Sequence, residues 1–123
     1  MKILLLIGSG SFIGGIIRYY LSQFIQIKTV ATFPLGTLAV NIIGCFFIGL
    51  IVGLIDKESI GSEWRFFLIT GLLGGFTTFS AFSMESVTLF RDGQILYAFT
   101  YIGLSVLVGL LATFAAYSLV SNK

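Results

Sequence analysis

Four long apolar stretches fill most of the 123 residues of this chain. They run over residues 3–27, 33–55, 64–90 and 95–120, and only short connections separate them. Each stretch reaches the length of about 20 apolar residues that a helix needs to cross the hydrocarbon core of a bilayer. The sequence therefore predicts an all-α, multi-pass protein of the cell membrane, with one four-helix transmembrane domain over residues 1–123.

The low charge of the chain supports a membrane location. Charged residues make up 10% of the sequence, whereas soluble domains carry about 25%, so we expect lipid to surround the helices. The net charge of +2 is too small to indicate a nucleic-acid partner. A run starting at Lys2 has the character of a signal peptide, but no cleavage motif follows it. We therefore expect a retained first span.

The distribution of Lys and Arg gives little preference for one orientation. Four spans would place both termini on the same side of the membrane. The cationic residues of that side would be Lys2, Lys57, Arg65 and Lys123. The opposite side would carry Lys28 and Arg91, with Arg18 ambiguous. Because orientation normally follows a clear excess of such residues, we expect insertion in both orientations and antiparallel pairing of two copies.

The third stretch contains a cluster of small and hydroxyl residues at the depth of the membrane centre. Two glycines, Gly74 and Gly75, precede two threonines, Thr77 and Thr78. Glycine is a poor helix former, and the carbonyls freed by a break could hold a small cation. The alternative is a continuous helix whose threonine hydroxyls bond to the preceding turn. The residue pattern leaves both alternatives open.

Two phenylalanines follow this cluster. Phe79 and Phe82 are three residues apart and would share one helix face, with Ser80 and Ser83 forming a stripe beside them. The edge of an aromatic ring is electropositive, so ring edges turned toward a pore would favour an anion. The alternative is ordinary packing against lipid or protein.

Polar residues in the second and fourth stretches could supply hydrogen-bond donors. Asn41 could donate to a passing anion or could join two helices. Tyr101 and Ser105 are four residues apart and would extend a track of donors. Tyr101 could equally anchor a helix at the membrane interface.

Two charged residues and several small residues also lie within the apolar stretches. Arg18 and Glu85 are functional candidates because an intramembrane charge is costly, and a location at a helix end is the alternative for both. Small residues recur at a spacing of four, as in Gly10 and Gly14. This spacing favours close packing of helix backbones.

Three sequence motifs stand in the first three stretches: G-x-x-x-G-G-x-x-R-Y at residues 10–19, G-T-L-A-V-N-x-x-G at 36–44, and G-G-F-T-T-F-S-A-F-S at 74–83. In order, spacing and chain length they resemble the motifs of the Fluc/CrcB family of fluoride-specific ion channels. The resemblance implies an antiparallel, dual-topology homodimer that exports fluoride passively and so reduces its toxicity inside the cell.

The resemblance also implies particular site residues. A structural sodium ion, which is not transported, would sit at the dimer centre on the backbone carbonyls of Gly74 and Thr77, where the third helix would be broken. Two departures concern Gly109, where many members carry a hydroxyl, and Ala81, which replaces a common threonine. The residues expected along the fluoride pathway are Arg18, Asn41, Thr78, Phe79, Ser80, Phe82, Tyr101 and Ser105.

Two other functions are compatible with four short spans. A small multidrug exporter needs a buried carboxylate in its first span, and this chain has none there. A passive assembly subunit would leave the Gly-Gly-x-Thr-Thr cluster and Asn41 without a role. We expect no enzyme, because the sequence offers neither a nucleophile–base pair nor a phosphate-binding loop.

Overall fold

The computed structural model describes residues 1–29 and 32–123. The predicted connection at residues 26–32 includes residues 30 and 31, which lie outside the described residues. Four helical stretches of the described chain are long and apolar enough to cross a membrane, as predicted. The elements are α1 (Lys2–Ile27), α2 (Leu35–Asp56), the π-helical segment η1 (Phe66–Leu73), α3 (Gly74–Phe76), α4 (Phe79–Arg91) and α5 (Ile95–Ser121).

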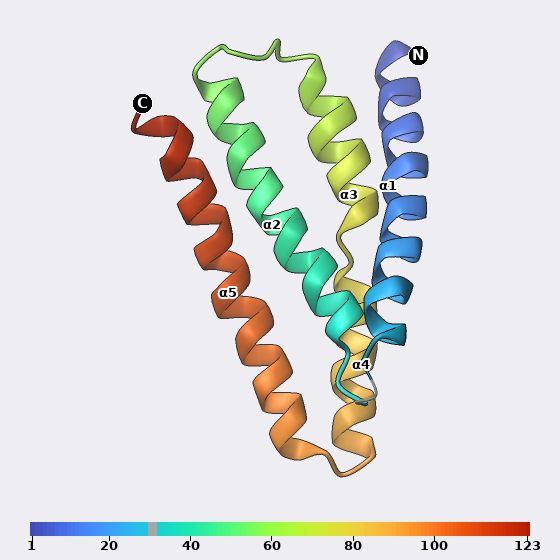
Figure 1. The fold of residues 1–123 in the computed structure, drawn as a ribbon. Helices are drawn as coiled ribbons and strands as arrows, with labels where there is room; N and C mark the ends of the chain where they lie inside the picture. The colour runs from blue at the N-terminus through green and yellow to red at the C-terminus, as the bar shows by residue number, and fades with distance from the viewer. Residues whose placement is uncertain (30–31) are drawn as a thin grey trace.

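The helices form an elongated bundle with both chain ends on the same side (Figure 1). The connection between α2 and η1 lies at that end, and the connection between α4 and α5 lies at the opposite end (Figure 1). Gly93 makes the second connection possible, because its φ of 80° falls in the left-handed region that glycine adopts without strain. This arrangement confirms the prediction that the termini share one side.

Glycines bring α1 and the first half of the third span into backbone contact. A Cβ at Gly14 would overlap the carbonyl oxygen of Leu72, and one at Gly75 would lie 2.6 Å from the carbonyl oxygen of Ser11. The Ser11 hydroxyl also donates a hydrogen bond of 3.4 Å to the carbonyl oxygen of Gly71. These contacts confirm that the glycine spacing serves close helix packing.

A second close contact joins α2 to α5. A Cβ at Gly49 would overlap the carbonyl oxygen of Thr113. The Thr113 hydroxyl donates to the carbonyl oxygens of Cys45 at 2.8 Å and of Gly109 at 3.2 Å. The two helices are therefore fixed to one another about halfway along their length.

The third span is interrupted between α3 and α4. Thr77 (φ −87°, ψ 153°) and Thr78 (φ −146°, ψ 115°) are both extended. The helix break is therefore present, and the alternative of a continuous helix is wrong. Figure 1 shows the chain passing through this short extended segment between the label α3 and the label α4.

A pocket at the helix break

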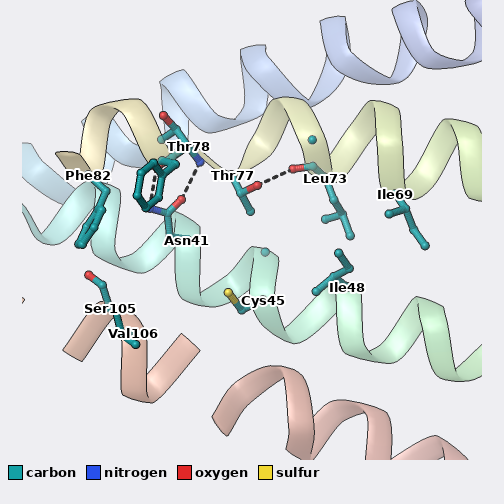
Figure 2. Close-up of a pocket in the computed structure, with 13 residues that line it drawn as sticks. Asn41, Cys45, Ile48, Ile69, Leu73, Thr77, Thr78, Phe82, Ser105 and Val106 are labelled. Atoms are coloured by element: carbon teal, nitrogen blue, oxygen red, sulfur yellow. Dashed lines mark hydrogen bonds between the residues drawn. The ribbon is translucent and has the colours of Figure 1, made fainter. Parts of the chain in front are cut away.

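A pocket of about 350 Å³ opens beside the break, between α2, the two halves of the third span and α5. Most of the surface of its wall is apolar, and Ile48, Ile69, Leu73 and Val106 are its aliphatic residues (Figure 2). Its aromatic lining residues are Phe79 and Phe82. The polar side chains on its wall are those of Asn41, Cys45, Thr77, Thr78 and Ser105.

The Asn41 amide pairs with both backbone groups of Thr78. Its Nδ2 donates to the Thr78 carbonyl oxygen at 3.0 Å, and its Oδ1 accepts from the Thr78 N–H at 2.8 Å. Figure 2 shows this pair of bonds joining α2 to the extended segment. An unpaired backbone group costs several kcal/mol in a membrane, so Asn41 stabilises the break. Within the described residues its second Nδ2 hydrogen has no hydrogen-bond partner.

The two threonines of the break have different local roles. The Thr78 hydroxyl accepts from the backbone N–H of Ala81 at 3.2 Å and so caps the start of α4. The Thr77 hydroxyl donates back to the carbonyl oxygen of Leu73 at 2.9 Å. A Cβ at Gly44 would overlap the Cγ2 methyl of Thr77, so this glycine lets α2 approach the break.

The break also frees carbonyl oxygens at the end of α3. The Arg18 Nε donates to the carbonyl oxygen of Gly75 at 3.1 Å. No hydrogen bond within the described residues reaches the carbonyl oxygens of Gly74, Phe76 and Thr77. The described chain also holds no cluster of three or more His, Cys, Asp or Glu residues. A cation bound here would therefore use backbone oxygens, which suit hard cations.

The two phenylalanines of α4 differ in exposure. Their ring centroids are 5.5 Å apart, and Phe82 also packs on the ring of Tyr101 at 5.3 Å. Phe79 is 79% exposed. The single chain therefore leaves one aromatic wall of the pocket uncovered.

A group of three hydrogen-bonded side chains lies next to the pocket. The Tyr101 hydroxyl donates to Glu85 Oε2 at 2.7 Å, and the Thr37 hydroxyl donates to Glu85 Oε1 at 2.8 Å. Tyr101 is fully buried, so its interpretation as an interfacial anchor is wrong. Glu85 lies six residues before the end of α4 at Arg91, and Arg18 lies nine residues before the end of α1 at Ile27.

The structure brings most of the predicted pathway residues together. Asn41, Thr78, Phe79, Phe82 and Ser105 line the pocket, as do both predicted cation-site residues, Gly74 and Thr77. The remaining three predicted pathway residues, Arg18, Ser80 and Tyr101, do not line the pocket, but each makes a contact with a residue on its wall or next to it. Ser80 shares a hydrogen bond of 3.3 Å with Thr78, Tyr101 packs on Phe82, and Arg18 bonds to Gly75.

Sequence reasoning missed the roles of Thr37 and Cys45. Thr37 lies four residues before Asn41, and Cys45 lies four residues after it, so all three lie along one face of α2. This spacing of four residues was the sequence signal that could have placed Thr37 and Cys45 on the same helix face as Asn41. The Ser105 hydroxyl oxygen is buried and has no hydrogen-bond partner among the described residues.

Comparison with known proteins gives a consistent match over nearly the whole chain. The model of a family described as "CrcB-like protein, Camphor Resistance (CrcB)" matches residues 5–117. A fluoride-specific ion channel FluC of Flavobacterium psychrophilum is 47% identical over 114 residues, which is 92% of each chain. The FluC proteins of Rhizobium etli and Agrobacterium fabrum are 45% and 44% identical, over 90% and 95% of this chain and 90% and 94% of their own.

Proposed function

The chain belongs to the CrcB-like family, and we propose from this premise that it is a fluoride-specific ion channel that lets fluoride leave the cell passively. The observation that carries the proposal is the 47% identity to a FluC channel across 92% of both chains. Export of this kind would keep fluoride below toxic levels in the cytoplasm. The four apolar helices support a location in the cell membrane.

The chemistry of the pocket supports an anion pathway. A small anion gives up its water only if other donors replace it, and those donors must not hold it too tightly. The described chain offers uncharged donors here, including the Ser105 hydroxyl and the free Nδ2 hydrogen of Asn41. The rings of Phe79 and Phe82 would add electropositive edges without a fixed charge.

We propose that a structural sodium ion binds at the break. The free carbonyl oxygens of Gly74 and Thr77 fit such an ion, while the neighbouring carbonyl of Gly75 is occupied by Arg18. The ion would supply positive charge at the end of α3, where the helix dipole concentrates negative charge. It would stay in place during fluoride passage.

We propose that two copies pair in antiparallel orientation. The 79% exposure of Phe79 supports a partner that covers this side of the pocket. The weak bias in Lys and Arg between the two ends supports insertion in both orientations. Each dimer would then hold two fluoride pathways.

The channel proposal is tested by fluoride efflux from liposomes that contain the purified protein. A fluoride electrode follows release from fluoride-loaded vesicles, and chloride-loaded vesicles provide the control. We expect rapid fluoride release and no chloride release. Equilibration of the protein without sodium, before reconstitution, should reduce fluoride release if the ion at the break is structural.

The result also separates the alternatives. A folded protein that releases no fluoride would contradict the channel proposal. Proton-coupled transport of organic cations by that protein would favour an exporter, and the absence of any flux would favour an assembly subunit. Fluoride release that does not depend on sodium would overturn only the sodium proposal.

A further inference from the structure

Four residues of α5 form a stripe along one face of the helix, because they follow one another at a spacing of four. They are Tyr101, Ser105, Gly109 and Thr113. The hydroxyls at both ends of the stripe are already used. Tyr101 donates to Glu85, and Thr113 donates to two backbone carbonyls.

The middle of the stripe is different. Within the described residues the buried Ser105 hydroxyl has no partner, and Gly109 has no side chain at all. A Cβ at Gly109 would lie 3.3 Å from the sulfur of Cys45. A side chain at position 109 would therefore press against the thiol of α2, which would have to shift by a few tenths of an ångström.

Cys45 shares the pocket with Ser105. Figure 2 shows its side chain on the side of α2 that faces α5, with Ser105 directed from α5 toward α2. The Thr113 hydroxyl fixes the backbone of Cys45 at this level. The described residues provide no hydrogen-bond partner for the sulfur, so its S–H, a weak donor, is available inside the pocket.

We propose that the Cys45 thiol contacts the anion in the pathway, next to the Ser105 hydroxyl and at the level of Gly109, where α5 offers no side chain. This inference rests on the proposed fluoride conduction and deepens it. Three features carry the inference: the shared cavity, the unpartnered Ser105 hydroxyl, and the close approach of the sulfur to position 109. An uncharged thiol would offer a donor to fluoride without holding it tightly.

The first test compares two substitutions that differ by one hydroxyl. Cys45→Ala removes the donor, and Cys45→Ser keeps one at the same position. We expect Cys45→Ala to slow fluoride efflux from liposomes by about fivefold, since one weak hydrogen bond to an ion is lost. Cys45→Ser should conduct at least as fast as the unaltered protein.

The second test moves the donor from α2 to α5. Gly109→Ser in the Cys45→Ala background places a hydroxyl where the sulfur no longer crowds it, and we expect it to restore efflux to within twofold of the unaltered protein. Ile51→Val is the matched control, because Ile51 is a buried residue of α2 that does not line the pocket. Cys45→Val serves as a second donor-free variant if Cys45→Ala does not fold.

The outcomes separate this inference from the channel proposal. No fluoride release by the unaltered protein would contradict the channel proposal itself. If the unaltered protein conducts and the folded donor-free variants conduct within twofold of it, Cys45 is not a pathway residue. A slow Cys45→Ala protein that Gly109→Ser fails to restore would overturn the exchange of donors between the two helices.

Discussion

At the scale of single residues, the Asn41 side chain links the fold to the site. Its oxygen and one of its N–H groups pair with the backbone of Thr78, which lies 37 positions later in the chain. Without this pairing, the extended segment would expose an N–H and a carbonyl at a depth where water is scarce. One amide side chain on the pocket wall thus pairs both backbone groups of Thr78 and maintains the break.

Asn41→Asp should block fluoride passage. A carboxylate oxygen would replace Nδ2 opposite the Thr78 carbonyl oxygen, so two acceptors would face each other, and a negative charge would repel the anion. Asn41→Ala should lower the free energy of unfolding by about 1–3 kcal/mol for each unpaired backbone group of Thr78. Liposome efflux and denaturant unfolding in detergent measure the two effects. Normal fluoride conduction by Asn41→Asp would mean that Asn41 does not line the fluoride pathway.

The aromatic residues of the pocket give a second prediction at this scale. Phe79→Ile and Phe82→Ile should each lower fluoride efflux while the proposed dimer stays intact, because the electropositive ring edge is lost and most of the volume remains. Phe46→Ile is the control, since Phe46 lies on the outside of α2 and does not line the pocket. Undiminished efflux in both pocket variants would show that the two rings do not contribute to fluoride conduction.

At the scale of helices, the packing of α1 against η1 and α3 depends on glycine. The carbonyl of Leu72 occupies the space where a Cβ of Gly14 would lie. Gly15, the next residue of the same helix, has no atom within 4 Å of an added Cβ. Two neighbouring glycines of one motif thus have opposite tolerance for a methyl group.

Gly14→Ala should therefore destabilise the bundle, and Gly15→Ala should not. Overpacking of a close contact costs about 1–3 kcal/mol, and this contact involves backbone that cannot rotate away. Denaturant unfolding in detergent compares the two variants. Equal stability would mean that α1 shifts freely against η1, contrary to the contacts that the structure describes.

The sequence predicts the helices better than their internal irregularities. The four spans follow from hydrophobicity alone, and the Gly-Gly-x-Thr-Thr cluster marks the place of the break. The choice between a break and a continuous helix depends on Asn41 pairing with Thr78, a contact between distant positions that no local pattern encodes. The π-helical form of η1 was missed because an apolar run gives no signal that separates i→i+5 from i→i+4 bonding.

At the scale of the whole molecule, a single chain does not enclose the pocket at the helix break. The pocket lies beside an exposed aromatic ring, and the carbonyl oxygens of Gly74, Phe76 and Thr77 have no hydrogen-bond partner within the described chain. Both termini lie at one end (Figure 1), and the cationic residues are spread over both ends with only a weak bias. An antiparallel second copy would bring an equivalent break to the same membrane depth and cover the open side.

Labelling of both connections tests this arrangement. In a Cys45→Ser background, Ser59→Cys places a thiol in the connection between α2 and η1, and Asp92→Cys places one in the connection between α4 and α5; both positions are exposed. Because the Lys and Arg bias is weak, we expect a membrane-impermeant maleimide to label about half of each variant in intact cells. Complete labelling of one variant and none of the other would establish a single orientation, and the pocket would then have to be completed by a parallel partner or by lipid.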